Sequence, residues 1–130
     1  MSTVAVATVV REVLECAYGE LGVRAVDVDL ADGLVIQGSP SGTRRLLLKL
    51  LLNAAKGAPA DGVIELVAER SGLGVAIRIC DRGPGPPKGL VFTTVQDPEV
   101  QELAASMQGL AVIVPRVGGG TEAAVWLPCP

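Results

Sequence analysis

Three polar residues interrupt a leucine-rich segment of the chain. Lys49, Asn53 and Lys56 are spaced at i, i+4 and i+7, so on a helix they share one face. An amide oxygen and two ammonium groups on one face have the chemistry to hold a magnesium ion and phosphate oxygens. The same stripe also fits the solvent-facing side of an amphipathic helix, which is the more frequent reason for such a pattern.

A single carboxylate, Asp81, follows a segment in which apolar residues alternate. Val75, Ile77 and Ile79 share its parity, so Asp81 is predicted to point toward the core where the strand ends. A carboxylate buried there needs a partner, because burying an unpaired charge is costly. The exocyclic amino group of a purine would serve as that partner. The alternative is an aspartate that caps the turn after the strand.

The loop that begins with Asp81 has the composition of a turn that faces a ligand. Its sequence is Asp-Arg-Gly-Pro-Gly-Pro-Pro over residues 81–87. Gly83 and Gly85 allow the backbone to approach a flat ligand closely, and the prolines stiffen the loop. The loop has neither the Lys-Ser/Thr of a P-loop nor the third glycine of a dinucleotide fold, so neither phosphate site is indicated.

These residues must be positioned by a regular set of helices and strands. Hydrophobic periodicity predicts helices over residues 5–21, 39–56 and 98–108, and strands over 25–30, 34–37, 63–69, 73–80, 110–117 and 121–127. Ser39-Pro40 is a helix start signal, and Asp32-Gly33 predicts a tight turn that joins two strands in a hairpin. Strands in hairpins with helices on one face predict an α+β two-layer sandwich with a mixed, mostly antiparallel sheet.

Composition excludes several classes of function. The 130 residues suffice for a single domain, residues 1–130, and 49% are hydrophobic. Three aromatic residues and a net charge of −3 argue against nucleic-acid binding, which needs stacking platforms and positive charge. The chain has no histidine, so it has no histidine-based catalysis and cannot phosphorylate a histidine of its own.

The cysteines and the apolar runs bear on the compartment. Cys16, Cys80 and Cys129 have no metal-ligand spacing and are predicted to be reduced, structural thiols. The apolar run at residues 46–52 contains Lys49 and is far shorter than the ~20 residues of a membrane span. No signal-peptide pattern is present, so we expect a cytoplasmic protein without membrane insertion.

The order of these segments resembles the catalytic domain of bacterial histidine kinases. Residues 46–56, Leu-Leu-Leu-Lys-Leu-Leu-Leu-Asn-Ala-Ala-Lys, resemble its leucine-rich helix that ends in Asn-Ala-x-Lys. Residues 79–87, Ile-Cys-Asp-Arg-Gly-Pro-Gly-Pro-Pro, resemble its Asp-x-Gly-x-Gly loop, and residues 107–128 resemble its closing hairpin. The family belongs to a wider superfamily of gyrase and MutL ATPases. The resemblance therefore implies a histidine-kinase-type ATP-binding fold over nearly the whole chain.

The resemblance also implies roles for particular residues. Asn53 would ligate the Mg²⁺ carried by ATP or ADP, and Lys56 would lie near the phosphates. Asp81 would accept a hydrogen bond from the adenine amino group, while Gly83 and Gly85 would line the base. These are binding roles, and no residue of the chain is expected to be catalytic.

Further implications concern the closing strand and the partners. Thr121 would support the Asp81 side of the pocket through a water molecule. The implied partners are a histidine-bearing phosphoacceptor domain or a response regulator.

Three departures from the family pattern modify this expectation. Lys49 stands where a second asparagine is usual, and Gly57-Ala58 replace an aromatic–threonine pair. Residues 90–94 resemble the family's phenylalanine box, but only residues 95–97 separate them from the helix at Pro98. That spacing leaves out the ATP lid and the second glycine loop, which supply backbone N–H groups to the phosphates. The pocket is therefore expected to accept adenine and to hold the triphosphate weakly.

Three functions remain open at this point. The first is a nucleotide-binding, kinase-type domain of two-component signalling that transfers phosphate to a histidine on another domain or chain. The second is a docking or scaffold module of a phosphotransfer protein, and such a module no longer binds ATP. The third is an anti-sigma-factor-type serine kinase. It ranks below the other two because the leucine-rich helix and the 81–87 loop look closer to the histidine-kinase branch. Lys49 replaces the carboxylate base of ATP-hydrolysing relatives, so rapid hydrolysis is not expected.

Overall fold

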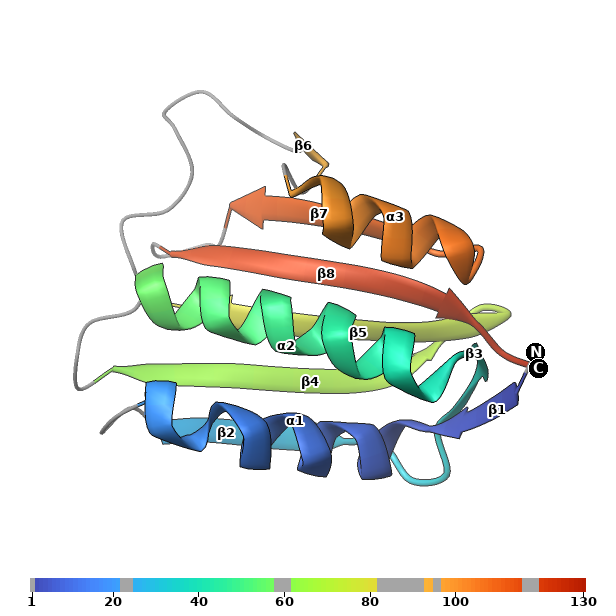
Figure 1. Ribbon diagram of the computed structural model, residues 1–130, viewed down its shortest axis with the longest axis horizontal. Helices are drawn as coiled ribbons and strands as arrows, with labels where there is room; N and C mark the ends of the chain where they lie inside the picture. The colour runs from blue at the N-terminus through green and yellow to red at the C-terminus, as the bar shows by residue number, and fades with distance from the viewer. Residues whose placement is uncertain (1, 22–24, 58–61, 82–92, 95–96, 116–119) are drawn as a thin grey trace.

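The protein is a two-layer α+β sandwich, as its sequence predicts. The computed structural model describes residues 2–21, 25–57, 62–81, 93–94, 97–115 and 120–130. Within these ranges three helices cover one face of a mixed sheet, and both chain ends lie at the same end of the molecule (Figure 1). No helix of the described residues is long and apolar enough to cross a bilayer.

The helices begin within one residue of their predicted starts. They are α1 (Val6–Leu21), α2 (Pro40–Gly57) and α3 (Pro98–Ser106). The Oγ of Ser39 accepts a hydrogen bond from the N–H of Gly42 at 3.1 Å, which caps α2. Helix α3 ends two residues before the predicted boundary, because Gln108 has a φ of 61° and Gly109 N–H returns to the carbonyl of Ala104 at 2.8 Å.

The main sheet has six strands among the described residues. Their order is β2-β4-β5-β8-β7-β6, with bounds Ala25–Leu30, Val63–Ser71, Gly74–Asp81, Thr121–Pro128, Leu110–Pro115 and Thr93–Thr94. Strands β2 and β4 run parallel, and all the other neighbours in this sheet are antiparallel. The predicted mixed, mostly antiparallel sheet is therefore confirmed.

The predicted hairpin of residues 25–30 and 34–37 is wrong. Strand β3 (Val35–Gly38) pairs instead with β1 (Ser2–Ala5), which was not predicted, while β2 pairs with β4. A turn does form at Asp32-Gly33, with a φ of 69° at Gly33. The turn motif specifies only a local reversal, whereas the pairing follows burial: β1 and β3 contribute Val4 and Ile36 to the core, 3% and 0% exposed.

The core is aliphatic and lies between the helices and the sheet. One side of α2 is almost fully buried, with Leu46, Leu47, Leu50 and Leu51 each at most 2% exposed. They belong to one buried cluster with the inward-facing residues of β4 and β5, Ile64, Leu66, Ile77 and Ile79. No disulfide joins the three cysteines; Cys80 is buried, whereas Cys16 is exposed and is not a core residue.

Two glycines provide a matched test of this packing. A Cβ at Gly109 would collide with the carbonyl oxygen of Trp126 and the side chain of Leu127, whereas a Cβ at Gly19 in α1 meets nothing within 4 Å. We expect Gly109→Ala to lower the free energy of unfolding by about 1–3 kcal/mol, as overpacking does. Gly19→Ala should raise it by up to about 1 kcal/mol, because alanine is the better helix former. Urea denaturation of both variants checks the pair; equal effects would contradict the described packing.

Candidate functional site

Three of the predicted site segments meet at one end of the sandwich. The C-terminal end of α2, the C-terminal end of β5 and the first residue of β8 lie together there (Figure 1). Asp81, the last residue of β5, is the register partner of Thr121, the first residue of β8. The topology thus brings Asp81 and Thr121 together, although forty positions separate them in the sequence. The structure describes the backbone of Thr121 but not its side chain.

Asp81 is buried, as its parity in the strand predicts. It is 8% exposed, and with Thr43 it makes up the buried polar or charged side chains of the described residues. Val75, Ile77 and Ile79, which share its parity, are each at most 1% exposed. The strand therefore holds a carboxylate inside the sandwich at its C-terminal end. Gly83 and Gly85 lie outside the described residues, so their predicted role stays a prediction.

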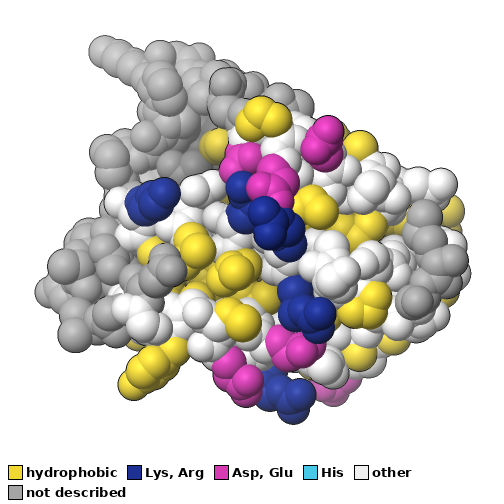
Figure 2. Space-filling model, viewed as in Figure 1, with side chains coloured by type: hydrophobic (Ala, Val, Ile, Leu, Met, Phe, Trp, Pro, Cys, Tyr) yellow, Lys and Arg dark blue, Asp and Glu magenta, His cyan; other side chains and the backbone are white. Residues whose placement is uncertain are grey.

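The polar residues of α2 lie on its outer side. Asn53 and Lys56 are exposed, while the side chain of Lys49 is 29% exposed. Figure 2 shows Lys, Arg, Asp and Glu side chains gathered in a band across the helical side of the molecule, next to apolar groups. An exposed amide and ammonium near the end that holds Asp81 are able to meet a ligand bound there. Their exposure fits both a contact with a ligand and a solvated helix face.

Lys49 is engaged by two carboxylates at the start of α3. Its Nζ donates to Glu99 Oε2 at 2.8 Å and lies 3.1 Å from Asp97 Oδ2. Arg45, one turn earlier on α2, forms an ion pair with Glu99 as well. This arrangement ties α2 to α3. Lys49, which the sequence placed among the candidate phosphate-binding groups, is therefore already paired with carboxylates.

The N-terminus of α3 is capped by its own carboxylate. Asp97 Oδ1 accepts from the N–H groups of Glu99 at 2.9 Å and Val100 at 3.4 Å. Such N–H groups are the ones that bind anions at helix N-termini. Here Asp97 already satisfies two of them, and Glu99 adds a second negative charge in the first turn.

Asp97 and Glu99 are not among the site residues predicted from the sequence. Asp-Pro-Glu at residues 97–99 carries the signals of a capped helix start, with an acceptor at the cap and proline at the first helical position. What the sequence does not show is that Lys49 reaches this start. That contact spans 50 positions and depends on how α3 packs across α2.

The Lys49 ion pairs should contribute modestly to stability. We expect Lys49→Met to lower the free energy of unfolding by up to about 1 kcal/mol, because the three side chains remain partly exposed to water. Lys56→Met is the matched control on the same helix, at an exposed position. Urea denaturation at low and high salt checks this expectation. The difference between the variants should shrink with salt, and a difference that grows with salt would contradict it.

A cation-binding cluster is not found among the described residues. No group of three or more His, Cys, Asp or Glu side chains there lies close enough to hold a metal ion. Mg²⁺ commonly keeps several waters and takes only one or two protein ligands together with substrate phosphates. An exposed amide such as Asn53 fits that limited role, which remains a prediction.

Solved structures share this fold over nearly the whole chain. A mycobacterial sensor histidine kinase, MprB, has a TM-score of 0.83 at 22% identity, covering 98% of this chain and 96% of that one. The histidine kinase ThkA, in complex with the response regulator TrrA, has a TM-score of 0.86 at 16% identity, covering 99% and 42%. Full-length ShkA in complex with AMPPNP has a TM-score of 0.79 at 22% identity, covering 98% and 30%.

The comparisons establish the fold. The chain has the fold of histidine-kinase catalytic domains, which is the fold that the resemblance of residues 46–56 and 79–87 implies. No protein-family profile matches the chain, and no curated protein sequence matches it.

Proposed function

We propose that this chain is an adenine-nucleotide-binding domain of the two-component histidine-kinase type, with a weak hold on the triphosphate. The observation that supports it best is the buried carboxylate of Asp81 at the C-terminal end of β5, directly before residues 82–87 of the glycine-containing motif. A carboxylate in that place suits a hydrogen bond from the adenine amino group, which distinguishes adenine from guanine. ShkA, which has the same fold, is solved with the ATP analogue AMPPNP, and that adds support.

This chain differs from the histidine-kinase pattern on the phosphate side of the proposed pocket. Asp97 caps α3 with its own carboxylate, and Lys49 is paired with Asp97 and Glu99. Phosphates brought to this helix start would meet two negative charges and N–H groups that are already bonded. Together with the short 95–97 connection, this supports a pocket that recognises the base more than the phosphates.

The remaining groups fit the roles that the resemblance implies. Asn53 would bind the Mg²⁺ that accompanies the nucleotide, and Lys56 would neutralise phosphate charge from the same exposed face of α2. The magnesium would shield the phosphate charge when bound. Thr121 would support Asp81 across the β5–β8 pair, and Gly83 and Gly85 would line the base.

The partners follow from what the chain lacks. Because it contains no histidine, any phosphate it transfers must go to a histidine-bearing domain elsewhere or on another chain. ThkA is solved with a response regulator, and a partner of that class is proposed here as well. The cytoplasm is the proposed location.

Calorimetric titration with adenosine, ADP and ATP in the presence of Mg²⁺ tests the proposal. We expect saturable binding of all three, with dissociation constants for ADP and ATP within about threefold, less than 1 kcal/mol apart. The reason is that the γ-phosphate finds no additional donors at the start of α3. ATP that binds far more tightly than ADP would contradict the weak phosphate hold.

GTP serves as the control nucleotide, because it carries the same phosphates and a carbonyl group in place of the adenine amino group. Binding of GTP as tightly as ATP would contradict the role of Asp81. The absence of binding heat at millimolar ATP and ADP would overturn nucleotide binding altogether.

A docking module without nucleotide is the second candidate. The observation that favours it is that Lys49 forms ion pairs with Asp97 and Glu99. These pairs would leave Lys49 unable to bind phosphates at the start of α3. The same titration separates the two candidates, since a docking module gives no nucleotide heat and still binds its phosphotransfer partner.

A further inference from the structure

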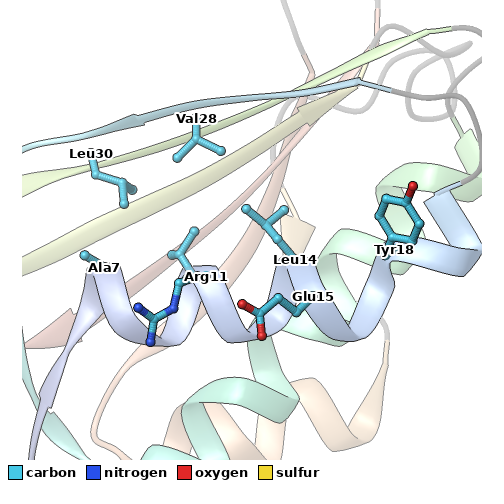
Figure 3. Close-up of a pocket in the computed structure, with 8 residues that line it drawn as sticks. Ala7, Arg11, Leu14, Glu15, Tyr18, Val28 and Leu30 are labelled. Carbon is cyan, nitrogen blue, oxygen red and sulfur yellow. The ribbon is translucent and has the colours of Figure 1, made fainter.

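An apolar groove runs between α1 and β2 (Figure 3). Its volume is about 430 Å³, and its apolar lining includes Leu14 and Tyr18 from α1 and Val28 and Leu30 from β2. Tyr18 is 81% exposed and Val28 is 38% exposed, although both are large hydrophobic side chains. Exposed apolar side chains that gather along one groove are able to contact another molecule.

Strand β2 forms one edge of the six-stranded sheet. Among the described residues it pairs only with β4, through residues 25–30 against 63–68. The backbone groups on its other side therefore point away from the sheet. An edge of this kind can accept an extended segment of another chain as an added strand, with main-chain hydrogen bonds providing affinity.

The side chains of β2 alternate between two chemistries. Val28 and Leu30 point toward α1 and form one wall of the groove (Figure 3). Because successive side chains of a strand point to opposite faces, Asp27 and Asp29 lie on the other face of the sheet, and both are exposed. Asp27 also has a carboxylate, Glu65, as its register partner on β4. The edge is therefore apolar on one face and acidic on the other.

We propose that β2 is a docking edge for an extended segment of a partner protein in which apolar and basic residues alternate. The apolar residues of that segment enter the groove beside Val28 and Leu30. Its basic residues lie across from Asp27 and Asp29, where opposite charges on neighbouring strands attract. The spacing of two residues along β2 matches the period of an extended segment and sets the order of its side chains.

Two other occupants fit the edge less well. Antiparallel pairing with β2 of a second copy, centred on Val28, would place Asp27 of one copy opposite Asp29 of the other, and like charges in that position destabilise a sheet. An amphipathic helix would fill the groove from the α1 side. It would then leave Asp27 and Asp29 without a contact, since they lie on the opposite face.

The test uses three short peptides with uncharged, protected ends, each long enough to span β2. In the first, valine and lysine alternate; in the second, valine and glutamate alternate; the third has the composition of the first in blocks. We expect the valine–lysine peptide to bind at least about tenfold more tightly than either of the others, measured by fluorescence anisotropy. On binding, the amide signals of Ala25–Leu30 should shift and exchange more slowly in NMR spectra.

Two variants make the result specific. The double variant Asp27→Lys/Asp29→Lys changes exposed residues only, and it should reverse the preference in favour of the valine–glutamate peptide. Val28→Lys places a charge in the groove and should lower the affinity for the valine–lysine peptide at least about tenfold. Circular dichroism verifies that both variants are folded.

Several outcomes would overturn the proposal. The first is equal binding of the alternating valine–lysine peptide and of the peptide that has valine and lysine in blocks. The second is a peptide preference that survives the charge reversal, and the third is amide shifts confined to residues outside β2. Loss of binding in Tyr18→Ala together with no effect of charge reversal would identify a helix in the groove instead. A concentration-dependent dimer in sedimentation that Val28→Lys abolishes would identify a second copy.

Discussion

Asp81→Asn is expected to weaken ATP and ADP binding about tenfold or more while leaving the fold intact. The change keeps the size of the side chain and removes the charge, so a charge-assisted hydrogen bond to the adenine amino group becomes a neutral one. Charge-assisted bonds contribute about 1.5–3 kcal/mol against about 0.5–1.5 kcal/mol for neutral ones, and 1.4 kcal/mol corresponds to tenfold in affinity. Calorimetry with both nucleotides measures the loss.

The matched control for this substitution is Asp29→Asn, the same chemical change at an exposed position on β2. It should leave the nucleotide affinity unchanged. Thermal denaturation shows whether the buried site tolerates the amide. A folded Asp81→Asn variant that binds ATP as tightly as the unchanged protein would remove the observation on which the proposed function chiefly rests.

Leu47→Ala is expected to lower the free energy of unfolding by about 2–5 kcal/mol, through lost burial and the cavity left behind. Leu47 lies on the buried side of α2 and is 0% exposed. A loss of this size is a large fraction of the about 5–15 kcal/mol by which domains are stable. Urea denaturation measures it.

The control for the core substitution is Leu73→Ala, because Leu73 is 83% exposed at the β4–β5 turn. The change there should stay within about 0.5 kcal/mol, as surface substitutions usually do. If Leu47→Ala and Leu73→Ala had equal effects, α2 would not pack as described.

The parts of the site that could be predicted from the sequence are those with a local pattern. The leucines of α2 recur at helical spacing, so their burial and the exposure of Asn53 and Lys56 follow from 3.6-residue periodicity. Asp81 follows from the period of two in β5. The helix starts at Pro40 and Pro98 follow from capping residues directly before them. Each of these signals lies within a few residues of the feature it predicts.

The sequence by itself therefore determined the helices, most of the strands and the buried position of Asp81, because side-chain periodicity and capping are local. Only the tertiary structure decided that β3 pairs with β1, that β2 lies at an edge parallel to β4, and that Lys49 binds Asp97 and Glu99. These choices join distant segments, and they depend on which surfaces bury the most apolar area when the layers pack. That physical reason explains why the Asp32-Gly33 turn predicted a reversal correctly and the strand partner wrongly.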